Sequence, residues 1–254
     1  MKTTDNTILI TGGGSGIGRG LAEAFHRLGN QVIIAGRGQK ALDETIAANP
    51  GMKSVTLDVS DPKSIQSFAA RVAKDYPSLN VLINNAGIMG PENLLDTSND
   101  LSTAEKTIAT NLLGPIRLTA ALLPSLRKQP RATIMTVSSG LAFVPFAPTP
   151  TYCATKAAIH SYTQSLRYQL KSTKVEVIEL IPPYVQTTLM GDQQAEDPRA
   201  MPLSEFIDEA MSILKTQPDV KEVCVKKVHP LRFSAEHGQQ KYEEFFEQFN
   251  DSNK

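Results

Sequence analysis

Tyr152 and Lys156 are the residues whose types and spacing most directly suggest proton chemistry. They stand four residues apart at the start of an alanine-rich stretch, TPTYCATKAAIHSY (149–162), that has the pattern of a helix. Residues four apart on a helix lie on one face, with their Cβ atoms about 5 to 6 Å apart. A cation fixed beside a phenol favours the phenolate and lowers the phenol pKa from about 10 toward neutrality. The pair therefore predicts an acid/base unit, although an amphipathic tyrosine beside a solvated lysine has the same spacing.

A glycine-rich segment near the start of the chain predicts a dinucleotide site. The segment TGGGSGIG (11–18) follows an apolar run at 7–11 and leads into a helical pattern that begins at about Gly16. Gly12, Gly16 and Gly18 would allow a tight turn and a close backbone approach, and the helix offers unpaired N–H groups to a pyrophosphate. A purely structural turn would also use one or two glycines, so the flanking strand-helix-strand pattern is what favours the cofactor interpretation.

Arg37 indicates which dinucleotide such a site would prefer. The second apolar run ends in VIIAGR (32–37), so Gly36 and Arg37 stand where Asp or Glu usually meets a free ribose 2′-hydroxyl. A guanidinium can donate two hydrogen bonds to a 2′-phosphate, whereas a carboxylate would repel that group. Arg37 therefore favours NADP(H) over NAD(H), and the alternative is a solvated arginine at a strand end.

The apolar pattern predicts an α/β fold, with one doubly wound (Rossmann-type) parallel sheet of about seven strands and helices on both faces. Short apolar runs alternate with segments long enough for crossover helices, as expected for parallel strands buried on both faces. The chain of 254 residues is expected to form a single domain. The predicted strands are 7–11, 31–35, 54–58, 81–84, 132–138, 175–181 and a weaker 222–228, and later helices are expected near 203–215 and 241–249.

Composition argues against several classes of partner. Acidic and basic residues number 26 each, so the chain lacks the excess of basic charge typical of nucleic-acid or anionic-membrane binding. Cys153 and Cys224 are the only cysteines, and no basic segment followed by an apolar one opens the chain, so neither a disulfide framework nor a secretory signal is indicated. No apolar run reaches the roughly 18 residues of a membrane span. We expect a cytoplasmic enzyme that acts on a small molecule, without a nucleic-acid, membrane or metal partner.

Five segments occur together in the order and spacing of the short-chain dehydrogenase/reductase family. They are TGGGSGIG, NNAG (84–87), ATNLLG (109–114), TVSSG (136–140) and YCATK (152–156). The chain resembles this family from residue 7 to about residue 188. Within the family, the stretches VIIAGR, LAFVP and PPYVQT resemble the DltE-type oxidoreductases.

The resemblance implies a role for each matching residue. Tyr152 would be the general acid in reduction and the base in oxidation, and Lys156 would lower its pKa and hold the nicotinamide ribose. Ser139 would orient the substrate oxygen, whereas Ser138 is expected to be a buried hydroxyl, and Asn111 matches the family's fourth catalytic position. The implied cofactor residues are Gly12, Ser15, Gly16, Ile17, Gly18, Arg37, Asp58, Val59, Asn84, Tyr152, Lys156, Val185 and Thr187. The resemblance also implies a homodimer or homotetramer.

Three positions near the implied site leave alternatives open. Asp58 could accept a hydrogen bond from an adenine amino group or cap the helix that follows it. Pro115 lacks an N–H and its ring clashes with the carbonyl four residues earlier, so the Asn111 carbonyl is predicted to be free. The resemblance implies that this carbonyl holds a water in a proton relay, and the alternative is a bend without a chemical role. Pro183 stands where the family usually has glycine, which makes the implied roles of Val185 and Thr187 less direct.

An apolar substrate pocket is expected beside the tyrosine, next to a mobile loop at about 186–202. Such a lining favours ketones, aldehydes or secondary alcohols, so the first hypothesis is an NADP(H)-dependent carbonyl reductase or alcohol dehydrogenase. The alternatives are an NAD(H)-dependent enzyme of the same family and a dinucleotide-binding sensor without turnover. The predicted lining is Leu141, Phe143, Val144, Phe146, Tyr184 and Met190, of which Leu141 and Val144 would equally fit an ordinary core.

Overall fold

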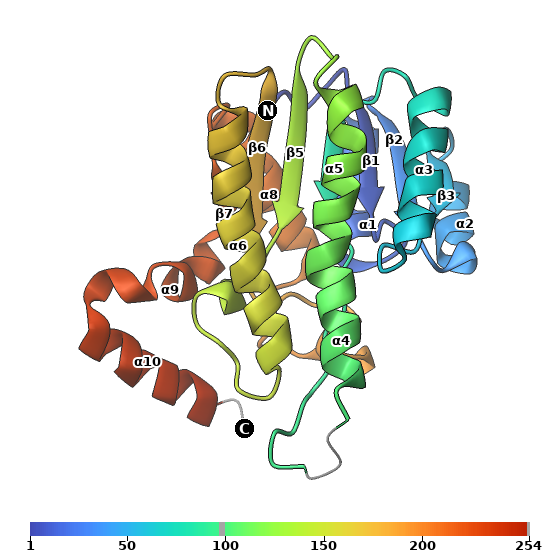
Figure 1. Ribbon diagram of the computed structural model, residues 1–254. Helices are drawn as coiled ribbons and strands as arrows, with labels where there is room; N and C mark the ends of the chain where they lie inside the picture. The colour runs from blue at the N-terminus through green and yellow to red at the C-terminus, as the bar shows by residue number, and fades with distance from the viewer. Residues whose placement is uncertain (97–99, 253–254) are drawn as a thin grey trace.

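Seven parallel strands form one sheet in the computed structural model, which describes residues 1–96 and 100–252 (Figure 1). The strands are β1 (Thr7–Thr11), β2 (Gln31–Gly36), β3 (Lys53–Thr56), β4 (Val81–Asn84), β5 (Ala132–Val137), β6 (Val175–Ile181) and β7 (Glu222–Cys224). Their spatial order is β3-β2-β1-β4-β5-β6-β7. The direction of strand addition therefore reverses between β1 and β4. In doubly wound sheets, a crevice at such a switch point is the usual ligand site.

The strands form where apolar runs are buried on both faces of the sheet. Every residue of β1, β4 and β5 is buried. The parallel register pairs Ile8 with Val32 on one side and with Val81 on the other. The predicted strand at 222–228 is shorter than expected, because the chain turns into a 3-10 helix at Lys226–Val228.

Helices cover both faces of the sheet, as predicted, which confirms the doubly wound fold class (Figure 1). α3, α5 and α6 lie on one face, and α1, α2 and α8 lie on the other. The helices are α1 (Gly16–Arg27), α2 (Gln39–Ala48), α3 (Pro62–Asp75), α4 (Ser102–Ile108), α5 (Gly114–Leu126), α6 (Pro150–Leu170), α7 (Asp192–Glu196), α8 (Leu203–Thr216), α9 (His229–Arg232) and α10 (Gln239–Asp251).

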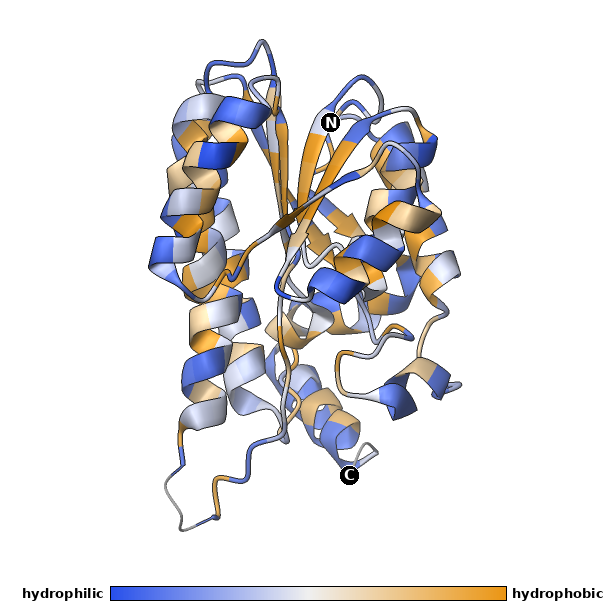
Figure 2. Cartoon of the chain, turned by 90° about the vertical axis from the view of Figure 1, so that its right-hand side faces the viewer, coloured by the Kyte–Doolittle hydropathy of each residue, from blue (hydrophilic) through white to orange (hydrophobic). Residues whose placement is uncertain are grey.

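Two apolar clusters, one on each face, form the core. One cluster joins Ile8 and Ile34 of the sheet to Phe25 of α1 and Phe206 of α8. The other packs strand residues against α3, α5 and α6. Figure 2 shows the apolar strands at the centre and hydrophilic residues on the outer helix surfaces. Within residues 1–96 and 100–252, no helix is long and apolar enough to cross a membrane.

The C-terminal elements extend away from the sheet. Figure 1 shows α9 and α10 running outward below the carboxyl ends of the strands. α10 has no fully buried residue, but its aromatic face turns back toward the body of the protein, where Phe249 packs edge-on against Phe146 with ring centroids 6.2 Å apart. The Asn250 side chain ties the helix to the chain by accepting a hydrogen bond from the Ala147 N–H at 2.7 Å and donating one to the Pro145 carbonyl at 3.1 Å.

Candidate active site

The glycine-rich turn forms one wall of a cleft at the switch point between β1 and β4. Gly12 has a φ of +67°, which L-residues rarely adopt. A Cβ on Gly18 would lie 2.2 Å from the Gly12 carbonyl oxygen, so the turn closes tightly only because both residues are glycine. Ser15 precedes α1 in an extended conformation, and its side chain makes no capping hydrogen bond. The first N–H groups of a twelve-residue helix therefore face this cleft.

The cleft has a volume of about 390 Å³ and brings together ten of the predicted site residues. Asn111, Arg37, Asp58, Val59 and Asn84 are not part of its lining. The predicted residues that line it are Gly12, Ser15, Gly16, Ile17, Gly18, Ser139, Tyr152, Lys156, Val185 and Thr187.

Arg37 and Asp58 lie near each other beyond the cleft, at the ends of β2 and β3. Burial alone would raise the pKa of Asp58, but hydrogen bonds from Ser60 and the charge of Arg37 together lower it. Arg37 itself is exposed. Asp58 does not cap α3, because the cap is Asp61, whose carboxylate accepts a hydrogen bond from the Lys63 N–H. The capping alternative for Asp58 is therefore wrong, and its contact with adenine stays a prediction.

Of the two asparagines at the end of β4, Asn85 lines the cleft, whereas the predicted residue Asn84 does not. Asn84 points away from the cleft and donates to the Thr119 hydroxyl at 3.0 Å. Asn85 lines the cleft, and its amide donates to the Thr11 carbonyl at 2.9 Å, which supports the turn at Gly12. The segment NNAG contains both residues, but only strand register decides which side chain faces the cleft.

Tyr152 and Lys156 share one face of α6, as predicted. Pro150 begins this helix, where its missing N–H costs nothing. Both side chains are nearly buried, with 6% of Tyr152 and 5% of Lys156 exposed. The Lys156 ammonium nitrogen lies 5.5 Å from the centre of the tyrosine ring and donates to the Val137 carbonyl at 2.8 Å. The helix and the end of β5 thus hold the two groups together.

The pKa of Tyr152 does not move in the predicted direction. Burial raises it above the usual value, because the phenolate would lose its hydration, and a hydrogen bond with Ser139 opposes this only partly. Burial also lowers the pKa of Lys156 to about 8. Desolvation thus sets the direction of the Tyr152 shift, and the expected lowering by Lys156 is not found. The phenol therefore stays protonated near neutrality.

Ser139 stands between Tyr152 and the apolar side of the site. It precedes the 3-10 turn Gly140–Ala142, and its hydroxyl accepts a hydrogen bond from the Leu141 N–H at 3.1 Å. Ser138 is buried at the strand end as expected, and within the described part of the chain its hydroxyl has no hydrogen-bond partner.

Asn111 lies in a π-helical turn, Ala109–Leu113, directly before α5. Within this turn the Gly114 N–H donates to the Ala109 carbonyl, five residues earlier, so the helix is irregular near Pro115 as predicted. The Asn111 side chain accepts from the Ile88 N–H at 2.9 Å and donates to the Ile88 carbonyl at 2.8 Å. It therefore holds the segment after β4 against the site, a contact that the sequence did not reveal. The free carbonyl of Asn111 stays a prediction.

A second, more apolar cavity of about 310 Å³ adjoins the cleft. Leu141, Phe146, Tyr184 and Met190 line it as predicted. Phe143 and Val144 do not: Val144 is fully buried in the protein, and Phe143 packs edge-on against His160 with ring centroids 4.7 Å apart. The residues that sequence reasoning missed are Met89, Gly140, Pro182, Pro183, Leu189, Gln194, Arg199, Leu231 and Phe249.

The segment 186–202 folds over this cavity. The Gln194 amide on α7 donates to the Val185 carbonyl at 2.8 Å and to the Thr187 hydroxyl at 3.1 Å. Val185 and Met201 form an isolated parallel bridge, which closes the segment at its base. These contacts position Thr187 beside the glycine-rich turn, where a Cβ on Gly16 would lie 3.3 Å from the threonine methyl.

Comparison with known proteins gives the same family for most of the chain. The sequence profile of the short chain dehydrogenases matches residues 6–198. The chain is 40% identical over 253 residues to the uncharacterized oxidoreductase DltE of Bacillus subtilis (strain 168), with 98% of each chain covered. This similarity confirms the predicted resemblance to DltE-type oxidoreductases.

Solved structures show the same fold. A short chain dehydrogenase from Burkholderia cenocepacia J2315, in complex with NADP, has a TM-score of 0.82 at 23% identity, covering 97% of this chain and 99% of its own. A short chain dehydrogenase/reductase from Burkholderia phymatum, in complex with NAD, has a TM-score of 0.80 at 21% identity, covering 93% and 95%. With the family profile, the DltE similarity and this fold in agreement, the chain belongs to the short-chain dehydrogenase family and is an oxidoreductase.

Proposed function

We propose that this protein is an NADP(H)-dependent carbonyl reductase or alcohol dehydrogenase. The observation that carries the proposal is the position of Ser139 and Tyr152, which line both the glycine-walled cleft and the apolar cavity. A proton donor and a hydroxyl thus stand where a cofactor and a carbonyl substrate would meet. A dinucleotide-binding sensor without turnover would not need hydroxyl groups that line both the cleft and the apolar cavity.

The cleft fits a nicotinamide dinucleotide. The tight turn at Gly12 and Gly18 leaves backbone, without side chains, at the start of α1, which suits a pyrophosphate. Lys156, Val185 and Thr187 line the same cleft and would hold the ribose and the nicotinamide. When bound there, the dinucleotide would supply the hydride in reduction and accept it in oxidation.

Tyr152 would move the proton. In reduction its buried phenol donates a proton to the substrate oxygen, and in oxidation the phenolate takes it back. Ser139 lies on the same boundary and would bind the substrate oxygen, so that the carbonyl is oriented toward the phenol. Lys156, as an ammonium, would stabilise the phenolate whenever Tyr152 gives up its proton.

We infer a preference for NADP(H) from Arg37. Its guanidinium is exposed, near enough to Asp58 for its charge to lower the pKa of that carboxylate, and no acidic side chain takes the place of Gly36. Similar proteins of this fold bind either NADP or NAD, so the alternative is an NAD(H)-dependent enzyme.

We propose ketones, aldehydes or secondary alcohols with apolar substituents as substrates, because Leu141, Phe146, Met190 and Phe249 line the second cavity. An apolar wall discriminates between substrates by roughly 1 to 3 kcal/mol per methylene, so broad specificity is expected. The segment 186–202 is proposed as the mobile loop over this cavity. A homodimer or homotetramer is the proposed assembly.

A substrate panel with both cofactors tests the proposal. Purified protein is mixed with NADPH or NADH and a series of aryl and aliphatic ketones and aldehydes, and cofactor absorbance is followed. We expect substrate-dependent oxidation that is faster with NADPH. Binding of cofactor without consumption across the panel would favour the sensor, and faster turnover with NADH would favour the NAD(H)-dependent alternative.

A further inference from the structure

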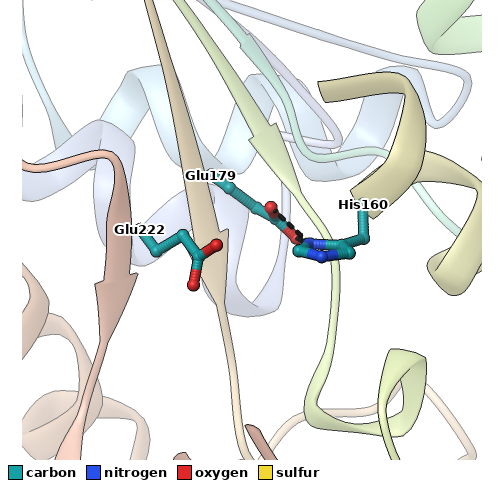
Figure 3. Close-up of side chains that lie close together, drawn as sticks. All are labelled: His160, Glu179 and Glu222. Atoms are coloured by element: carbon teal, nitrogen blue, oxygen red, sulfur yellow. Dashed lines mark hydrogen bonds and ion pairs between the residues drawn. The ribbon is translucent and has the colours of Figure 1, made fainter. Parts of the chain in front are cut away.

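Glu179 is a fully buried carboxylate that contacts α6, the helix that carries the proposed proton donor Tyr152. It lies on β6 and points to the face of the sheet that α6 covers, where His160 binds it (Figure 3). The His160 Nδ1 atom lies 2.8 Å and 3.0 Å from the two carboxylate oxygens. His160 stands one helical turn after Lys156 on α6. A buried carboxylate is costly unless it is hydrogen-bonded, and His160 supplies that contact to Glu179.

The charges around Glu179 come from three elements. β7 places Glu222 directly beside it in the sheet register and also carries the Cys224 thiol. Arg232 of α9 binds Glu222 with an N–O distance of 2.7 Å. Each carboxylate thus has its own basic partner. Although His160, Glu179 and Glu222 could approach one metal ion, their oxygens and nitrogen are already engaged in this network.

The sheet register places Glu179 beside Thr136 of β5, next to Val137, whose carbonyl binds the Lys156 ammonium. The lysine is buried, and its ammonium donates to the Val137 carbonyl. Burial lowers the pKa of Lys156 to about 8, and Glu179 acts in the opposite direction. Without that charge, the fraction of lysine in the ammonium form near neutrality would fall.

We propose that Glu179, held in place by His160, is a positioning residue that keeps Lys156 in its ammonium form during turnover. It touches neither of the two cavities and acts only through the lysine. The inference deepens the proposed function, because it depends on the role given there to Lys156. It also gives a function to a buried charge that the site itself does not use.

The test is the pH dependence of two measurements in Glu179→Gln. One is kcat for ketone reduction, and the other is the dissociation constant of NADPH, followed by its fluorescence. Loss of the charge should move the alkaline limb of both profiles to lower pH by about one unit, which corresponds to a tenfold change in the lysine's protonation constant. Glu222→Gln removes the neighbouring carboxylate and is the matched control, and Glu179→Asp keeps the charge. Both should retain the wild-type limbs.

If Glu179→Gln lowers kcat but leaves the alkaline limb of both pH profiles unshifted, the proposal is overturned and Glu179 is a structural residue. A shift of the same size in Glu222→Gln would overturn it as well. If Glu179→Gln unfolds, the double variant His160→Gln, Glu179→Gln replaces the pair with two amides that can bond to each other, and the same shift is expected. If the wild type reduces no substrate, the proposed function fails, and the NADPH-binding profile still decides the role of Glu179.

Discussion

At the scale of single residues, Arg37 gives the most specific prediction, which is a preference for NADPH over NADH. Arg37→Ala should weaken NADPH binding by about tenfold, the low end for a charge-assisted hydrogen bond, because this side chain is exposed to solvent screening. NADH has no 2′-phosphate and should bind as before. The dissociation constants of both cofactors are the measurement, and Lys40→Ala, which removes a nearby exposed cation of α2, is the control. Equal loss for the two cofactors would make Arg37 an ordinary surface arginine.

The burial of Lys156 predicts a pH-dependent stability. Its folded-state pKa is about 8, below the value of 10.5 expected for an unfolded chain. The unfolded state therefore binds more protons between these values, so this residue's destabilising effect is full below pH 8 and vanishes as the pH rises through 10.5. Lys156→Met should unfold at higher urea than the wild type at pH 7, and the difference should shrink by pH 10. A difference that does not change with pH would show that the lysine is not desolvated in this way.

At the scale of elements, α10 is expected to shape substrate choice. Phe249 lines the apolar cavity, and Asn250 anchors the helix to the segment 145–147. Phe249→Ala should raise KM for bulky aryl ketones by about tenfold, as expected for loss of an aromatic contact, while kcat and NADPH binding change little. Tyr242→Ala, on the same helix but outside the cavity lining, is the control. Equal effects of the two variants on KM would mean that α10 acts through stability alone.

The elements also show where sequence patterns stop being informative. The predicted strands agree with the observed ones within two residues, except at 222–228, where only Glu222–Cys224 pairs with β6. Short apolar runs specify buried strands well, but pairing at a sheet edge depends on how the following chain turns. An irregular helix at Asn111 was indicated by Pro115, but its π-helical form was not. The side-chain bonds of Asn111 to Ile88 link distant segments and follow no local pattern.

At the scale of the whole molecule, the sequence predicted the cleft better than the pocket. Glycine spacing and the Tyr152–Lys156 pair are local, and the switch point of the sheet brings them together. The substrate cavity is assembled from distant segments, so Phe249 was missed and Phe143, which packs against His160, was included. The direction of the Tyr152 pKa was also wrong, because helical spacing gives the distance to a cation but not the extent of burial.

The most direct test of the central claim compares the wild type with Tyr152→Phe. The phenylalanine ring keeps the packing on α6 and removes the proton, so reduction of the best ketone with NADPH should fall by at least about a hundredfold. The dissociation constant of NADPH should remain within about threefold, because the cofactor cleft is retained. The measurement is single-turnover oxidation of bound NADPH alongside fluorescence titration. Turnover of more than a few per cent of wild type, with cofactor binding intact, would contradict the role of Tyr152 as the proton donor.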